Sequence, residues 1–158
     1  MGHYLQAFIC TKTDSENFAK SFKNAISISL GQGIALVPMT EELFDEINNS
    51  QTSCFIKNFK FINENIEEII LKIIENKKLA YVESEYFGST GSQKAIIWNQ
   101  KNREQVLVLG KDNINNVLKY FGVIADEGID EFQTLGFHNN RSTQKWIENT
   151  LKQNPTGF

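Results

Sequence analysis

The segment 62–78 carries the most regular hydropathy pattern in the chain, and this pattern restricts the folds that the chain can adopt. Six isoleucines stand at i, i+4, i+7, i+8, i+11 and i+12 from Ile62 to Ile74, and most positions between them are charged or polar. This spacing predicts an amphipathic helix with one aliphatic face. Because such a face is stable only when it is covered, we expect the helix to pack against a β-sheet.

The segments after this helix predict the sheet. Residues 79–87, 93–99 and 104–109 are rich in β-branched and aromatic residues and are separated by turn sequences, which is typical of an antiparallel meander. Further strands are expected at 4–11 and 33–37, and further helices at 13–29, 40–47, 110–121, 128–136 and 142–151. We therefore predict a single α+β domain over residues 1–153, with an antiparallel or mixed sheet of about four or five strands covered by amphipathic helices. Residues 154–158 are expected to form a flexible C-terminal tail.

Composition excludes several kinds of partner. The chain has 16 Lys and Arg against 19 Asp and Glu, a formal net charge of −3. A nucleic-acid binder needs a basic surface to displace counterions, so we expect no nucleic-acid partner. No apolar run approaches the length of a membrane span, and the first residues lack the pattern of an export signal. Two cysteines are too few for a disulfide framework, so we expect a cytoplasmic protein without a membrane partner.

The first strand of the meander carries the most informative polar residues. Side chains alternate along a strand, so Tyr81, Glu83, Glu85 and Phe87 are expected to share one face. Two neighbouring carboxylates repel each other, and beside apolar residues they lose solvation, which is one way to make a general acid or base. The alternative is that this face is the solvated side of a one-sided antiparallel sheet.

The register of the hairpin decides which residues oppose the glutamates. A five-residue loop at 88–92 would pair Phe87 with Gln93 and set both glutamates opposite apolar residues of the next strand. The other face, which includes Val82 and Tyr86, is then the one expected to receive the isoleucine-rich helix. The loop leads into a strand and lacks a GK[ST] or GxGxxG motif, so we interpret it as a hairpin connection and not as a phosphate site.

Few other residues carry recognisable chemistry. His138 and Arg141 lie in a polar loop, where they could hold an anionic substrate or serve in acid/base catalysis; the alternative is ordinary surface. No His, Cys or carboxylate cluster has metal-ligand spacing, so we expect no metal and no cofactor.

Two acidic clusters are a third feature. The first lies in a predicted helix and the second in a predicted loop and helix start: Glu41, Glu42, Asp45 and Glu46, and Asp126, Glu127, Asp130 and Glu131. Such runs are usually solvated surface. Their functional interpretation is an acidic patch that meets a basic partner.

The second half of the chain contains a set of residues that resembles a known group. Residues 81–93 have the sequence YVESEYFGSTGSQ, close to the pattern EYFGGxGxQ except for Ser89, and an apolar strand ending in Trp98 follows. The likeness continues through 112–115, 118–122, 130–132, Gly136, Arg141 and Trp146. This pattern resembles a group of small bacterial cytosolic proteins without an assigned activity, some of which are similar to immunity proteins. The resemblance implies a protein that neutralises a cognate toxin by binding it.

We therefore carry two functional hypotheses forward. The first is a protein-binding module of the immunity or inhibitor type that acts by surface complementarity on a basic, toxin-like partner, with Tyr81, Glu83, Glu85, Phe87 and Arg141 at the contact. The alternative is a small hydrolase or transferase in which Glu83, Glu85 and His138 perform acid/base catalysis. We favour the non-enzymatic hypothesis, and a homodimer is a further possibility.

Overall fold

Six antiparallel strands form one sheet in the computed structural model, which describes residues 2–153. Their order is β2-β3-β1-β4-β5-β6, so the first strand of the chain lies in the middle of the sheet. The strands are β1 (His3–Thr11), β2 (Ile28–Gly31), β3 (Ile34–Pro38), β4 (Lys78–Phe87), β5 (Thr90–Asn99) and β6 (Asn102–Leu107). The segment 154–158, expected to be a flexible tail, lies outside the described residues.

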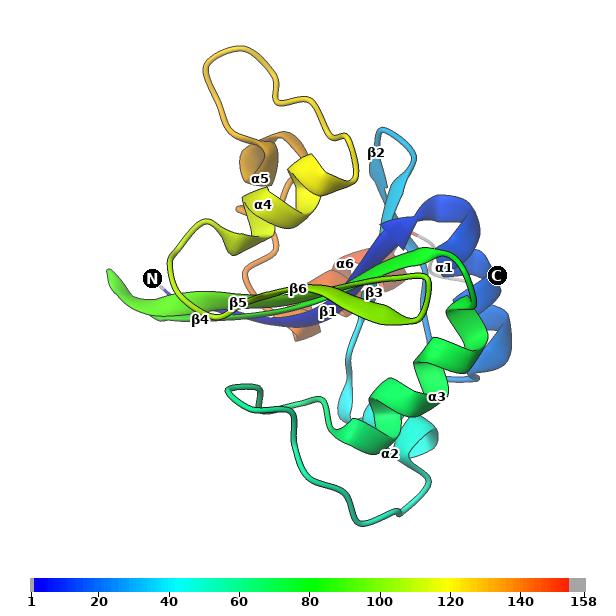
Figure 1. Ribbon diagram of the computed structural model, residues 1–158. Coiled ribbons are helices and arrows are strands. Elements are labelled where there is room, and N and C mark those ends of the chain that lie inside the picture. Colours follow the sequence, from blue (N-terminus) through cyan, green and yellow to red (C-terminus); the bar gives the residue numbers. More distant parts are fainter. Residues whose placement is uncertain (1, 154–158) are drawn as a thin grey trace.

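Helices cover both faces of this sheet. They are α1 (Lys12–Ser21), α2 (Glu41–Asn48), α3 (Glu64–Ile74), α4 (Asn113–Tyr120), α5 (Glu131–Thr134) and α6 (Thr143–Gln153). Figure 1 shows α2 and α3 on one side of the sheet and α4 and α5 on the other. The prediction of a single α+β domain is confirmed, with one strand more than the upper number expected.

Two hydrophobic cores fill the two sides of the sheet. The isoleucine-rich helix α3 buries Ile66, Ile70 and Ile74 as predicted. Its core also contains large aromatic side chains of β1, β4 and β5: Phe8, Tyr81 and Trp98. The second core is formed by the opposite side chains of the same strands with α4, the segment after α5, and α6. Each central strand is therefore buried on both faces.

The face that receives α3 differs from the prediction. The helix packs on the face that carries Tyr81, and not on the face of Val82. The reason is the hairpin register, because Phe87 pairs with Thr90 and the connection has only two residues. This register differs from the expected one by an odd number of residues, which moves every side chain of β5 to the other face relative to β4.

The segment 13–29 also differs from the prediction of one long helix. The helix α1 begins earlier than expected, because the side chain of Thr11 caps it by accepting from the Asp14 amide at 3.2 Å. The helix ends at Ser21, and residues 28–31 form the edge strand β2. Pairing with β3 thus prevails over the helical spacing of the apolar residues.

The free edge of β1 is completed by the start of α6. Strand β3 pairs with β1 only from Ala7 onward, so the first residues of β1 lack this neighbour. The Tyr4 amide donates to the Arg141 carbonyl at 2.7 Å, and the Gln6 amide donates to Thr143 Oγ1 at 2.9 Å. On the same strand the Gln6 carbonyl accepts from the Met39 amide at 2.9 Å. These bonds bring the end of β3 and the beginning of α6 to one place.

Candidate functional site

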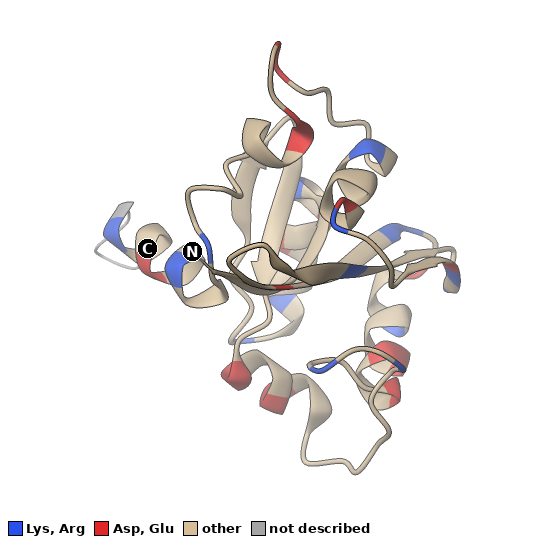
Figure 2. Ribbon diagram, turned by 90° about the vertical axis from the view of Figure 1, so that its left-hand side faces the viewer, with Lys and Arg blue, Asp and Glu red and all other residues tan. Residues whose placement is uncertain are grey.

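A cavity of about 590 Å³ lies where these segments meet. Four parts of the chain line it: Tyr4 and Gln6 of β1, residues 39–42, 44 and 45 at the start of α2, Phe55, Lys60 and Phe61 of the 49–63 loop, and residues 142–144 at the start of α6. In Figure 2 the acidic start of α2 and the basic residues of the loop both lie below the sheet. A concave site of this size is large enough for a small molecule or for one or two residues of a peptide.

The wall of the cavity is largely aromatic. Phe44 of α2 stacks on Phe55 of the loop, with ring centroids 6.2 Å apart and planes inclined by 23°. Tyr4 meets Phe61 edge to face, also at 6.2 Å. Phe55 is 53% exposed and Tyr4 is 42% exposed, so both rings offer apolar surface to an incoming group. Burial, with Glu85 nearby, raises the pKa of Tyr4, which keeps its hydroxyl protonated.

Three carboxylates of α2 form the rim of the cavity. The helix begins there because the Thr40 side chain accepts from the Leu43 amide at 3.1 Å and because acidic residues in a first turn suit the helix dipole. The side chains of Glu41, Glu42 and Asp45 line the cavity and take part in no hydrogen bond or ion pair among residues 2–153. These three carboxylates are therefore available to a cation.

The fourth member of this cluster, Glu46, has a different role. Its carboxylate accepts from the amides of Lys23 and Asn24, both at 2.7 Å, and it does not line the cavity. It thus fixes the turn after α1 to α2. The predicted acidic cluster divides into one structural residue and three residues at the rim.

Glu83 and Glu85 hold the opposite wall in place. The Glu83 carboxylate accepts from the amides of Lys60 and Phe61 at 2.9 and 2.8 Å, and from the Tyr81 hydroxyl at 2.8 Å. Glu85 pairs with Lys60 Nζ at 2.6 Å. Burial, followed by the charge of Glu83, raises the pKa of Tyr81 well above its ordinary value, so this hydroxyl is a permanent donor. Both glutamates thereby fasten the loop that carries Phe55, Lys60 and Phe61.

The alternative of a solvated glutamate face does not hold for Glu83, whereas Glu85 is partly exposed. Glu83 is only 8% exposed because the 49–63 loop covers it, and neither glutamate lines the cavity. Opposite them on β5 stand Lys94 and Ser92, in place of the apolar residues expected.

The other predicted site residues are dispersed. Tyr81 lies in the core between Phe8 and Phe59, whereas Phe87 is 75% exposed at the far end of β4. His138 and Arg141 are exposed residues of the loop before α6. Among the hydrogen bonds and ion pairs of the described residues, none joins either side chain to Glu83 or Glu85. Of the three acid/base residues of the enzymatic alternative, none lines the cavity, and His138 is not bonded to either glutamate within the described part of the chain.

Several residues of the cavity were missed in the sequence. Tyr4, Gln6, Phe44 and the residues 142–144 come from segments that showed ordinary strand or helix patterns. One signal was present, because phenylalanines and lysines alternate irregularly in 55–61 without fitting a helix or a strand. Aromatic residues in an irregular loop that no regular pattern explains are candidates for a binding surface.

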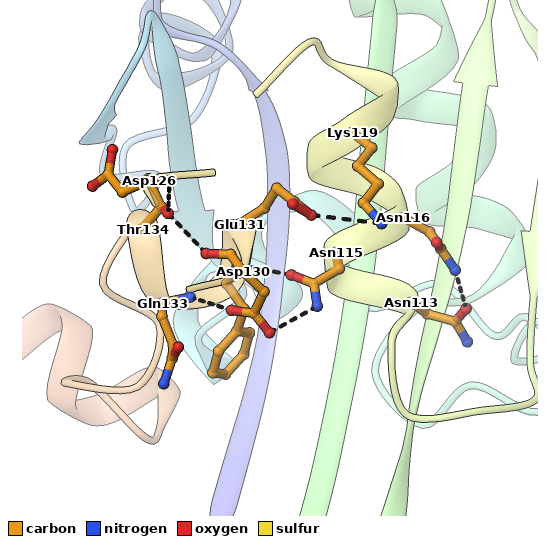
Figure 3. A network of polar contacts seen from close by, with 10 residues as sticks. Asn113, Asn115, Asn116, Lys119, Asp126, Asp130, Glu131, Gln133 and Thr134 are labelled. Atoms are coloured by element: carbon orange, nitrogen blue, oxygen red, sulfur yellow. Dashed lines mark hydrogen bonds and ion pairs between the residues drawn. The ribbon is translucent and has the colours of Figure 1, made fainter. Parts of the chain in front are cut away.

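Two of the four carboxylates of the second acidic cluster, those of Asp130 and Glu131, are engaged within the fold (Figure 3). Asp130 caps α5 by accepting from the Gln133 amide at 2.8 Å, and it also accepts from Asn115 Nδ2 at 3.1 Å. Glu131 is buried with its carboxylate 3.6 Å from Lys119 Nζ. These contacts connect α5 to α4, so half of this cluster serves the structure and the rim of the cavity is the better candidate for a functional acidic patch.

No helix within residues 2–153 has the length and apolar character of a membrane span. In the same part of the chain, no three His, Cys, Asp or Glu residues are grouped so that they could hold a metal ion.

Comparison with known proteins gives no match to a protein-family model, a curated protein or a solved structure. The fold and the cavity alone therefore define the class of this protein. It is an α+β domain whose antiparallel sheet is covered by helices on both faces, with an aromatic cavity that has an acidic rim.

Proposed function

We propose that this chain is a protein-binding module of the immunity or inhibitor type, which acts by covering a surface of a basic, toxin-like partner. The observation that carries the proposal is the cavity, where exposed aromatic side chains adjoin three carboxylates that have no partner among the described residues. Aromatic side chains are the usual anchors of protein interfaces, and unpaired rim charges steer an oppositely charged partner. The resemblance of residues 81–98, and of selected residues from 112 to 146, to a group of small bacterial proteins, some of which are similar to immunity proteins, is consistent with this function.

The partner is expected to be basic for an electrostatic reason. Glu41, Glu42 and Asp45 lie at the rim, and the cavity has one cationic lining residue, Lys60, whose charge is already paired with Glu85. An acidic partner would meet like charge without compensation, which costs binding energy and slows association. A basic partner would bind more tightly and associate faster.

A growth assay tests the proposal directly. The toxin-like basic proteins encoded beside the gene in its own host are expressed with and without this chain, and each pair is also examined by native mass spectrometry. We expect one of them to form a 1:1 complex with the chain and to lose its toxicity. If none forms a complex or is neutralised, the proposal is wrong.

Matched variants locate the contact. The rim variant combines Glu41→Gln, Glu42→Gln and Asp45→Asn, and we expect it to lose protection. The control variant combines Glu16→Gln, Glu75→Gln and Glu127→Gln, which changes the net charge equally at exposed positions away from the cavity. The control should protect as the wild type does, and a rim variant that also protects fully would contradict the assignment of the contact.

A further inference from the structure

The side-chain amide of Gln6 makes a hydrogen bond through its oxygen but not through its nitrogen within the described residues. Gln6 is only 6% exposed, and its Oε1 accepts from Thr143 Oγ1 at 3.1 Å. Its backbone amide and carbonyl are bonded to Thr143 and Met39. Its Nε2 has no hydrogen-bond partner among residues 2–153, although the residue lines the cavity. Because the residue is held in place and lines the cavity, this nitrogen can donate to a ligand that brings an acceptor into the cavity.

The negative charges of the cavity favour a ligand that carries a positive charge as well as the acceptor. Glu41, Glu42 and Asp45 supply negative charge on the α2 side, while Lys60 on the other side is occupied by Glu85. A ligand that matches this cavity therefore places a hydrogen-bond acceptor at Gln6 Nε2 and a positive charge at the three carboxylates. A peptide segment with a basic side chain offers both, since its backbone carbonyls are acceptors.

The aromatic wall suits the aliphatic part of such a side chain. Phe44 lies on the same helix as the three carboxylates, and Phe55, which stacks on it, is 53% exposed. Arginine and lysine carry long aliphatic stems below their charged heads, and these stems pack on apolar surface while the head reaches a polar rim. A cation close to an aromatic face gains further attraction from the ring.

We infer that the cavity receives one extended segment of the partner that presents an arginine or lysine, with a backbone carbonyl at Gln6 Nε2 and the cationic head at the carboxylates of Glu41, Glu42 and Asp45. The inference rests on the proposed function and adds to it the chemistry of the inserted residue. It makes α2 the specificity-determining element of the site.

Titration of the isotope-labelled chain with short peptides tests this inference without the partner. The probes are acetylated and amidated pentapeptides of alanine with arginine, lysine, citrulline or glutamate at the centre. We expect the arginine and lysine peptides to shift the NMR signals of the Gln6 side-chain amide and of the backbone amides at 41–45 and 142–144. Because citrulline keeps the shape of arginine without its charge, its peptide should bind about tenfold more weakly, a difference of about 1.4 kcal/mol.

Two variants separate the two contacts. The rim variant described above should bind the arginine and citrulline peptides equally weakly, whereas the control variant should keep the preference for arginine. Gln6→Leu should weaken both peptides by the same factor, because the backbone acceptor is common to them. Equal affinity of the wild type for arginine and citrulline peptides, or shifts confined to residues outside the cavity, would overturn the inference.

The outcomes also distinguish this inference from the proposed function. If a toxin-like partner is neutralised but the peptides do not select for positive charge at the cavity, the inference is wrong and the proposed function stands. If the peptides bind as expected and no partner is neutralised, the chemistry of the cavity stands and the immunity-type function is wrong.

Discussion

Glu83 shows how a single residue can be conspicuous in the sequence and still serve a role other than the one its chemistry suggests. Its carboxylate looked available for proton transfer, yet it accepts three hydrogen bonds, from two loop amides and the Tyr81 hydroxyl. A carboxylate held by this many donors is a fixed anchor point for the loop. Its neighbour Glu85 makes a single ion pair at the surface with Lys60.

The substitution Glu83→Gln should therefore destabilise the protein by about 2 kcal/mol, because the amide supplies one acceptor oxygen in place of two and presents its NH2 group to other donors. Urea unfolding measures the change in the free energy of unfolding, and hydrogen exchange measures the opening of the Lys60 and Phe61 amides. The matched change Glu85→Gln removes only an exposed pair and should cost less than about 1 kcal/mol. Equal effects of the two substitutions would contradict the anchoring role.

The burial of His3 predicts a pH dependence of stability that its sequence position did not suggest. The residue is buried, with Nδ1 2.7 Å from Ser84 Oγ, and burial lowers its pKa below the ordinary value of 6.5. The unfolded chain therefore binds this proton at a higher pH than the folded chain does. The stabilising contribution is complete above pH 6.5 and is lost as the pH falls from there toward the folded pKa, by at most about 1.4 kcal/mol per pH unit.

We expect the free energy of unfolding of the wild type to decrease between about pH 7 and pH 5.5, and this decrease to be absent in His3→Gln. Urea titrations across that range measure both. His138→Gln is the control, because His138 is exposed. A His3→Gln variant that keeps the slope of the wild type would show that another group titrates.

At the scale of elements, the connection between β4 and β5 determines which core each side chain of β5 enters. The choice between a two-residue and a five-residue connection set which face of the sheet carries Trp98, and so where α3 packs. The local signal for the shorter connection is Gly91, which lies inside β5 with a φ of +154°. A Cβ at this position would lie 2.0 Å from the Glu85 carbonyl oxygen, so only glycine fits the observed register.

Gly91→Ala should consequently destabilise the protein by about 3 kcal/mol, because backbone atoms of β4 must move. Gly88→Ala is the matched substitution in the same hairpin. Gly88 also has a positive φ, +62°, but open space surrounds its Cβ position, so a cost of about 1 kcal/mol is expected. Thermal or urea unfolding of both variants measures the difference, and the reverse order of stability would refute this account of the register.

At the scale of the whole molecule, two cores share one sheet and should behave as one cooperative unit. Each of the two tryptophans reports on a different core, Trp98 on the side of α3 and Trp146 on the side of α4. The middle strands contribute side chains to both cores, so neither core can lose its packing while the other stays intact.

The variants Trp98→Phe and Trp146→Phe each leave one fluorescent reporter. Both substitutions should lower the free energy of unfolding, but within each variant the fluorescence and far-ultraviolet circular dichroism transitions should have the same midpoint in urea. If the signal of Trp146 changes at a lower urea concentration than the circular dichroism does, the helices α4–α6 unfold as a separate unit and the prediction is wrong.

The amino-acid sequence by itself determined the elements with strong local patterns. The isoleucine-rich helix and the helices expected at 40–47 and 142–151 depend on residues three or four positions apart, and α3, α2 and α6 occur at these places. The strand β2 escaped prediction because its pairing with β3 outweighed a helical spacing of apolar residues. Only the tertiary structure decided the burial of Glu83 and the position of the cavity. These depend on contacts between segments far apart in the chain, such as Gln6 with Thr143, and no local pattern of side chains encodes which distant backbone will complete a strand edge.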